Sequence, residues 1–330
     1  MSPHQRVRVT GRFTSFQAPA AVLVATLVLV TCGRDVPESK ADSATRPSDS
    51  TILAGEPPVA PTSVVFWDAQ DGSAIYLPAE GGAAQVILPP VLDDSVPKPS
   101  SAVLPSDAAP ASVDLFAPSG LIGTVSVGEY TVGAQTAVSA GCDAWPVVPV
   151  RHGLGNPLLN WRIALQHGVG EPMHADSIGS IARTDSALLV VDINKAAALL
   201  PLDSSGVMRR VPFGVSKAYR FKLPGDVDVV VTVVERRLNV EASPRVERSV
   251  LVLERVAGSK AFKAVWTETQ YATEDDLIAV DLLGVVSMRA SGRPTLFLGQ
   301  DFGDGSRVQM LQRDGSGKWS VRWASAYTGC

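Results

Sequence analysis

Three of the four histidines lie close together in the sequence, where they could hold a metal ion or take part in acid–base chemistry: His152, His167 and His174. Glu171 and Asp176 lie beside them, and imidazole and carboxylate groups are ligands that zinc and other borderline metals accept. A metal site is therefore one function to consider for this stretch. The alternative is that the histidines are ordinary turn residues, because His152 and His167 open the similar turns HGLGNP and HGVGEP.

The strands expected around these turns separate the first two histidines. If Trp145–Arg151 pairs with Asn160–His167 as a hairpin, His152 lies at one end of it and His167 at the other. Seven strand residues that rise about 3.3 Å each would place them about 20 Å apart. Only His167 and His174 then remain as a pair that one metal ion could join.

A hydrolytic site is the second possibility, because His174, Asp176 and Ser177 are the residue types of a catalytic triad. Triads are assembled in space from separate parts of a chain, however, not from neighbours on one loop. The chain contains neither a Gly-x-Ser-x-Gly nucleophile elbow nor a His-Glu-x-x-His motif. We therefore expect Asp176 and Ser177 to begin a helical turn, and we assign no catalytic residue.

Two further motifs have some features of ligand sites. Asp301–Ser306, DFGDGS, has fewer oxygen ligands than a calcium loop needs, and its Asp-Gly pair favours a hairpin turn. Gly153 and Gly155 form a Gly-x-Gly that no helix follows, so they do not indicate a dinucleotide site. The sequence predicts no cofactor.

The strongest periodic pattern runs over residues 216–324 and predicts one antiparallel β-meander. Within Asp226–Asn239, valines occupy both faces, which is typical of a central strand covered on both sides. The charged segment Glu235–Arg248 is expected to be a solvated hairpin tip, with a protein-binding surface as the alternative. Asp304-Gly305 and Asp314-Gly315 are hairpin-turn signals between later strands.

One helix is predicted, from a cap at Thr184 or Asp185 to Leu200. Its apolar residues recur at helical spacing and include Leu189 and Ile193. We expect this helix to cover one face of the meander. The predicted fold class is therefore α+β, a mostly antiparallel β-meander sheet with one long helix (about 184–200) packed on it.

A faint internal repeat lies in the meander. Leu253–Trp266 and Leu311–Trp323 both contain Leu-x-Arg, a turn, a lysine, an aromatic residue and a late tryptophan. Two copies are too few for a propeller or a solenoid. Similar composition among hairpins of one sheet would explain the likeness without a true repeat.

Composition divides the chain into four parts: residues 1–31 as a signal peptide, 32–61 as a polar tether, 62–118 as a small β-hairpin piece with a Pro-rich linker, and 119–330 as the main β-rich domain. A three-strand piece is too small to fold alone, so we expect residues 62–88 to dock on the main domain. Leu121–Val127 is expected to pair with Glu129–Ala137.

The leader has a basic start and an apolar run of 14 residues, Ala18–Thr31, which is shorter than the roughly 20 residues of a membrane-spanning helix. It ends in Leu29-Val30-Thr31-Cys32, which resembles the lipobox of bacterial lipoprotein precursors. The resemblance covers the leader alone and implies that Cys32 becomes the lipidated first residue of the mature chain. Ordinary signal cleavage after Gly33 is the alternative.

Export bears on the three cysteines, Cys32, Cys142 and Cys330. If Cys32 is lipidated or removed, an even pair remains in an oxidising compartment, and parity favours a Cys142–Cys330 disulfide. Two buried free thiols are the alternative.

The net charge excludes nucleic acid as a partner. It falls from −4 to −7 on removal of residues 1–31, because that segment holds three arginines and no acidic residue. We expect an exported, lipid-anchored protein of the bacterial cell envelope that faces the periplasm or the exterior. It would act by binding, with a possible envelope protein partner, or as a scaffold. The alternative is a secreted hydrolase or metal-dependent enzyme that uses His167, His174 and Asp176.

Overall fold

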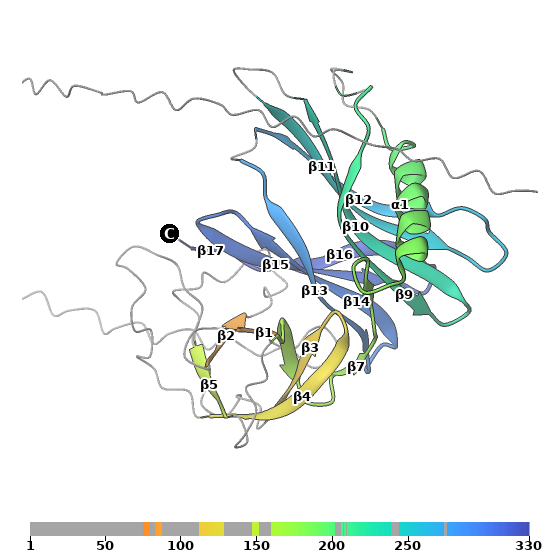
Figure 1. Cartoon of the computed structure of the whole chain (residues 1–330). Helices are drawn as coiled ribbons and strands as arrows, with labels where there is room; N and C mark the ends of the chain where they lie inside the picture. The colour runs from red at the N-terminus through yellow and green to blue at the C-terminus, as the bar shows by residue number, and fades with distance from the viewer. Residues whose placement is uncertain are drawn as a thin grey trace, which may run out of the picture. The chain divides into compact units, whose positions relative to one another are not determined.

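The computed structural model (Figure 1) describes residues 75–78, 83–87, 112–128, 147–151, 160–201, 206, 208, 210–238, 244–273 and 276–329. They belong to one compact unit that spans Pro58–Cys330. The predicted signal peptide and tether, residues 1–61, lie outside the described residues, as do Cys142 and Cys330.

The first six strands close into a barrel with the order β1-β2-β5-β4-β3-β6. Their bounds are β1 Ile75–Pro78, β2 Ala83–Ile87, β3 Ser112–Ala117, β4 Gly120–Val127, β5 Val147–Arg151 and β6 Ile163–Gln166. The pair β1–β2 is therefore part of the barrel, since β1 also pairs with β6 and β2 with β5. The expected boundary between residues 118 and 119 falls in the turn between β3 and β4, which pair with each other.

One strand pairing expected in this region is wrong, and one segment expected to be linker is a strand. β5 pairs with β2 and β4, and β6 pairs with β1 and β3, so these two strands do not form a hairpin. Residues 112–117, expected to be linker, form β3, in which all residues after Ser112 are buried. The predicted partner of β4, Glu129–Ala137, lies outside the described residues.

The rest of the chain forms two antiparallel sheets, not the single meander expected. The helix-covered sheet has the order β12-β11-β10-β9-β8, and the middle sheet has the order β16-β15-β14-β13-β7, with β17 beside β15. The strands of the first are β8 Asp176–Ser177, β9 Gly214–Leu223, β10 Val227–Leu238, β11 Arg245–Arg255 and β12 Lys263–Ala272. Those of the second are β7 Gly170–Pro172, β13 Ala279–Met288, β14 Arg293–Asp301, β15 Gly305–Arg313, β16 Trp319–Ala324 and β17 Thr328–Gly329.

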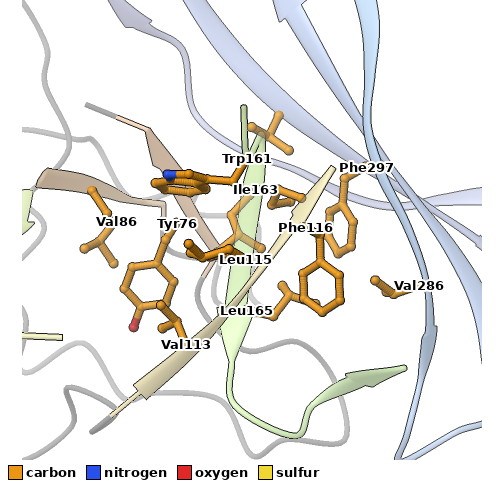
Figure 2. Packing of buried hydrophobic residues seen from close by; sticks show 14 of the residues in the cluster. Tyr76, Val86, Val113, Leu115, Phe116, Trp161, Ile163, Leu165, Val286 and Phe297 are labelled. Atoms are coloured by element: carbon orange, nitrogen blue, oxygen red, sulfur yellow. The ribbon is translucent and has the colours of Figure 1, made fainter. Parts of the chain in front are cut away.

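Three clusters of buried apolar side chains hold these parts together. One fills the barrel and reaches the middle sheet, where Phe116 and Leu165 of the barrel lie near Val286 and Phe297 (Figure 2). A second lies between the two sheets, and a third lies between the helix-covered sheet and the helix. The predicted central strand β10 is confirmed: Val231 belongs to the second cluster and Val230 to the third.

The predicted helix is present as α1, Arg183–Ala197, packed on one sheet face as expected. Leu189 and Ile193 are buried, at 5% and 0% exposure. The helix begins slightly earlier than expected: its N-cap position is Ala182, not Thr184 or Asp185, and no side chain caps it. It ends at Ala197 because tighter turns follow, in which the amides of residues 199 and 200 bond carbonyls three residues back.

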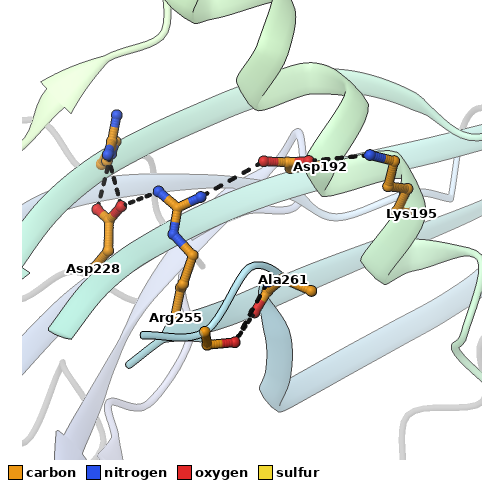
Figure 3. Close-up of polar contacts among 7 residues, drawn as sticks. Asp192, Lys195, Asp228, Arg255 and Ala261 are labelled. Carbon is orange, nitrogen blue, oxygen red and sulfur yellow. Dashed lines mark hydrogen bonds and ion pairs between the residues drawn. The ribbon is translucent and has the colours of Figure 1, made fainter. Parts of the chain in front are cut away.

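A chain of charged groups fastens α1 to the sheet (Figure 3). Asp228 of β10 accepts hydrogen bonds from Arg220 at 2.8 and 2.6 Å and from Arg255 at 2.6 Å. Arg255 lies 3.7 Å from Asp192 of the helix, which also meets Lys195. Burial raises the pKa of Asp228, but the hydrogen bonds from the two arginines outweigh burial, so the net shift of that pKa is downward.

The two copies of the faint repeat occupy corresponding places in the two sheets. Leu253–Trp266 spans the β11–β12 hairpin, and Leu311–Trp323 spans the β15–β16 hairpin. Each hairpin carries a bulge at the matching point, between Val252 and Leu253 in one and between Met310 and Leu311 in the other. Shared composition does not explain a bulge in the same register, so the likeness extends to the backbone.

Candidate functional site

His167 is held by a buried carboxylate on the barrel wall. Its Nδ1 lies 2.8 Å from Oδ1 of Asp114, whose side chain is 8% exposed. Thr124 and the Gly168 amide also donate to Asp114, at 2.6 and 2.9 Å. Burial raises the pKa of Asp114, but the bonds from Thr124, Gly168 and His167 outweigh it and the net shift is downward. Asp114 therefore fixes the turn between β6 and β7, where Gly168 adopts a positive φ of 82°.

His174 lies between two oxygen acceptors of different elements. Its Nδ1 is 2.7 Å from the carbonyl of Ser119 in the β3–β4 turn, and its Nε2 is 2.9 Å from Oδ1 of Asp176. A carbonyl and a carboxylate both accept, so this arrangement favours the imidazolium form, in which both ring nitrogens donate. The bond to Ser119 first, and then that to Asp176, raise the pKa of His174. An imidazolium has no lone pair for a metal ion.

His167 and His174 thus each pair with a separate carboxylate and are not brought together by a shared one. No group of three or more His, Cys, Asp or Glu side chains suited to a metal occurs in the part of the chain that the structure describes, and His152 lies outside that part.

The expected helical turn at Asp176 and Ser177 is wrong, since these residues form β8 and pair with Tyr219 and Arg220 of β9. The main chain there is extended because the segment adds an edge to the sheet. The hairpin turn expected at Asp304 is confirmed between β14 and β15. There the Gly303 amide donates to Asp301 at 2.8 Å, and the Tyr327 hydroxyl donates to Asp304 at 2.6 Å.

A pocket of about 320 Å³ lies at the C-terminal end of α1, against the segment that leads into β9. Apolar side chains form much of its wall, and its polar groups are two arginines and one asparagine. Its lining consists of Asn194, Ala197, Ala198, Leu200, Arg210, Val211, Pro212, Phe213 and Arg236.

A buried ion pair supports this pocket. The Arg236 side chain is 4% exposed and that of Glu247 is 1% exposed, and Nη2 lies 2.6 Å from Oε2. Arg236 also donates from Nε to Glu247 at 2.8 Å and from Nη1 to the Met208 carbonyl at 2.8 Å. Its guanidinium carbon lies 4.6 Å from the centroid of the Phe213 ring. The Glu247 carboxylate, the Met208 carbonyl and the Phe213 ring thus hold the guanidinium in one position.

The expected solvated tip is therefore wrong at two of its charged residues. Arg236 lies on the same face of β10 as Val230 and Val234, which pack toward the helix. The signal was available in the sequence, because residues two apart on a strand share a face. The many charges of Glu235–Arg248 masked that alternation.

Two groups at the pocket have hydrogen-bonding capacity to spare. Oδ1 of Asn194 is buried and accepts no hydrogen bond. Arg210 is exposed and forms no ion pair with the described residues. A ligand in this pocket could therefore pair with the Arg210 guanidinium, and it could satisfy Oδ1 of Asn194 if that side chain turned toward the pocket.

No protein-family model, curated protein or solved structure matches this chain. Among the helices of the described ranges, none combines the length and apolar character needed to cross a membrane.

Proposed function

We propose that this chain is an exported, lipid-anchored protein of the bacterial cell envelope that acts by binding, with the pocket beside α1 as its binding site. The leader supports export, and Leu29-Val30-Thr31-Cys32 supports lipidation at Cys32. The polar segment 33–61 would tether the domain to the membrane surface, facing the periplasm or the exterior.

The pocket is the observation that carries the binding role. Its volume of about 320 Å³ lies at the lower end of the range for ligand sites, about 300–1,000 Å³. Apolar walls with a few fixed polar groups are the usual composition of such sites. The enzymatic alternative has weaker support, because the ring nitrogens of His174 and Nδ1 of His167 already lie against oxygen atoms.

Anchoring is tested by changing Cys32 to Ser and fractionating the cells. The variant should leave the membrane fraction, because several acyl chains on one residue are needed for stable attachment. The matched control is Thr31→Ala, which changes the neighbouring residue, keeps the cysteine and should stay on the membrane. An unmodified mature terminus at Arg34, measured by intact mass, would contradict lipidation.

Binding is tested by capturing partners from envelope extract with the mature protein. Ala198 is exposed and lines the pocket, so Ala198→Trp should block the pocket without disturbing the core. Ala187→Trp is the control, since Ala187 is exposed on the same helix and does not line the pocket. If both variants capture the same partners equally well, those partners bind outside the pocket. Metal analysis of the same preparation addresses the enzymatic alternative, and a stoichiometric metal would favour it.

A further inference from the structure

We infer that the pocket beside α1 selects an anionic ligand, and that this ligand is an acidic peptide segment of a partner protein. The inference rests on the proposed binding function and adds the chemistry of the partner. Three features of the pocket point to it: its uncompensated charge, its unused acceptor and its size.

The uncompensated charge of the pocket is positive. Among the described residues that line it there are two guanidinium groups and no carboxylate. Glu247 balances the charge of Arg236 at 2.6 Å, whereas Arg210 forms no ion pair with the described residues. Among the described residues that line the pocket, one positive charge, that of Arg210, is therefore left without an ion pair.

The end of α1 opposes this charge only in part. A helix C-terminus carries about half a negative charge, which falls off within the last turn. Lys195 lies in that turn and offsets some of it. A cation would meet Arg210 at close range, whereas an anion would pair with it, so the pocket favours anions.

The unused acceptor indicates that the ligand also donates hydrogen bonds. Oδ1 of Asn194 is buried with no partner, and a simple anion such as a carboxylate alone has no N–H to offer it. A peptide carries backbone N–H groups together with acidic side chains. It would pair with Arg210 and, once the enclosed Asn194 side chain turned toward the pocket, would satisfy that residue as well.

The size of the pocket agrees with part of a peptide. About 320 Å³ is small for a whole ligand but suits one or two side chains of a larger partner. Leu200, Val211 and Pro212 would contact the apolar part of such a segment. An acidic residue next to an apolar one is therefore the sequence that the pocket would accept.

The test uses three fluorescein-labelled hexapeptides and the mature protein, with binding followed by fluorescence anisotropy. One peptide alternates glutamate with leucine, one glutamine with leucine, and one lysine with leucine. The acidic peptide should bind most tightly, and added salt should weaken it more than the neutral one.

The variants locate the effect. Arg210→Gln should weaken the acidic peptide by about three- to ten-fold and leave the neutral peptide unchanged, because an exposed pairing contributes modestly. Arg183→Gln is the control of matched residue type, since Arg183 is also an exposed arginine but lies at the start of α1, outside the pocket lining. Ala198→Trp should abolish binding of every peptide that uses the pocket.

The outcomes separate the inference from the proposed function. Equal affinity for acidic and neutral peptides, blocked by Ala198→Trp, would overturn the charge selectivity and leave the binding site in place. Acidic binding that Ala198→Trp or Arg210→Gln does not change would place the site elsewhere and overturn the inference. No binding of any peptide, together with no pocket-dependent partner from envelope extract, would overturn both.

Discussion

Replacing Glu247 with Gln should be among the most damaging single changes to a charged residue in this domain. The change leaves the Arg236 guanidinium 4% exposed, beside a neutral side chain where a carboxylate lay 2.6 Å away. Breaking a buried ion pair from one side costs about 3–5 kcal/mol, because the remaining charge is desolvated and unpaired. The amide of Gln still accepts one hydrogen bond, so we expect about 3 kcal/mol.

The control is a surface pair of the same charges. Lys222 and Asp226 lie 2.9 Å apart, but their side chains are 66% and 70% exposed. Asp226→Asn should change stability by about 0–1 kcal/mol. Asn also tolerates the positive φ of 56° at this position, so the backbone is not strained by the change.

The free energy of unfolding of both variants is measured by urea titration followed by tryptophan fluorescence. An unchanged dependence of that free energy on urea concentration indicates that the native fold is retained. The double change Arg236→Met with Glu247→Met separates charge from packing. Because neither charge is then buried, it should recover most of the loss. A cost below about 1 kcal/mol for Glu247→Gln would refute the argument, since that is the range of a solvated pair.

Three further predictions follow from the core, the charge network and the cysteines. Leu189→Ala should cost about 2–5 kcal/mol in urea unfolding, whereas Leu188→Ala, at a position 66% exposed on the same helix, should cost far less; equal losses would mean that the helix packs through a different face. Asp228 should make stability fall as pH drops, because its folded-state pKa is below the ordinary value of 3.8. The loss should begin near pH 4 and continue through the folded-state pKa, and it should be smaller in Asp228→Asn; parallel pH curves would contradict this. Thiol counting of denatured, unreduced mature protein should find no free thiol at Cys142 or Cys330, and two per chain would refute the disulfide.

Local pattern was enough to predict the elements that need only their own sequence. Valines on both faces of β10 and the helical spacing of Leu189 and Ile193 each identify a buried surface directly. These predictions hold because the burial of apolar side chains is the dominant stabilising contribution and requires a periodic pattern in the sequence.

Which strands pair with each other was not predictable in the same way. β1 pairs with β6 through Ile75 and Leu165, which are far apart in the sequence, and β5 and β6 each take partners other than one another. Alternation tells which residues share a face but not which strand lies alongside. The division into two sheets was missed for the same reason, because a link between two stacked sheets resembles a hairpin turn in sequence.

The candidate site was hidden by composition. Arg236 and Glu247 belong to a stretch with so many charges that it predicts solvent exposure, yet β10 continues its alternation through Arg236. His167 and His174, which belong to the first chemical signal, lie instead in the links before β7 and β8, where Asp114 and the Ser119 carbonyl hold them. A residue type that suits catalysis is thus a weaker indication of a functional site than a charged residue that falls on the buried face of a strand.

The two copies of the repeat pack in corresponding directions within their two sheets. Leu253 packs toward α1, and its counterpart Leu311 packs toward the helix-covered sheet. Trp266 packs toward the middle sheet, and its counterpart Trp323 packs toward the barrel. Corresponding residues therefore point in corresponding directions.

The two copies of the repeat pack alike, but their corresponding arginines bind different partners. Arg255 binds Asp228 on the next strand of its own sheet, at 2.6 Å. Its counterpart Arg313 binds Glu254 of the other sheet, at 2.8 and 3.1 Å, and Trp319 donates to the same carboxylate at 2.6 Å. Arg255 thus stabilises the side of its sheet that faces α1. Arg313, at the same position of the repeat, joins the two sheets. A repeated backbone with different polar partners explains why the sequence likeness is faint although the bulges coincide.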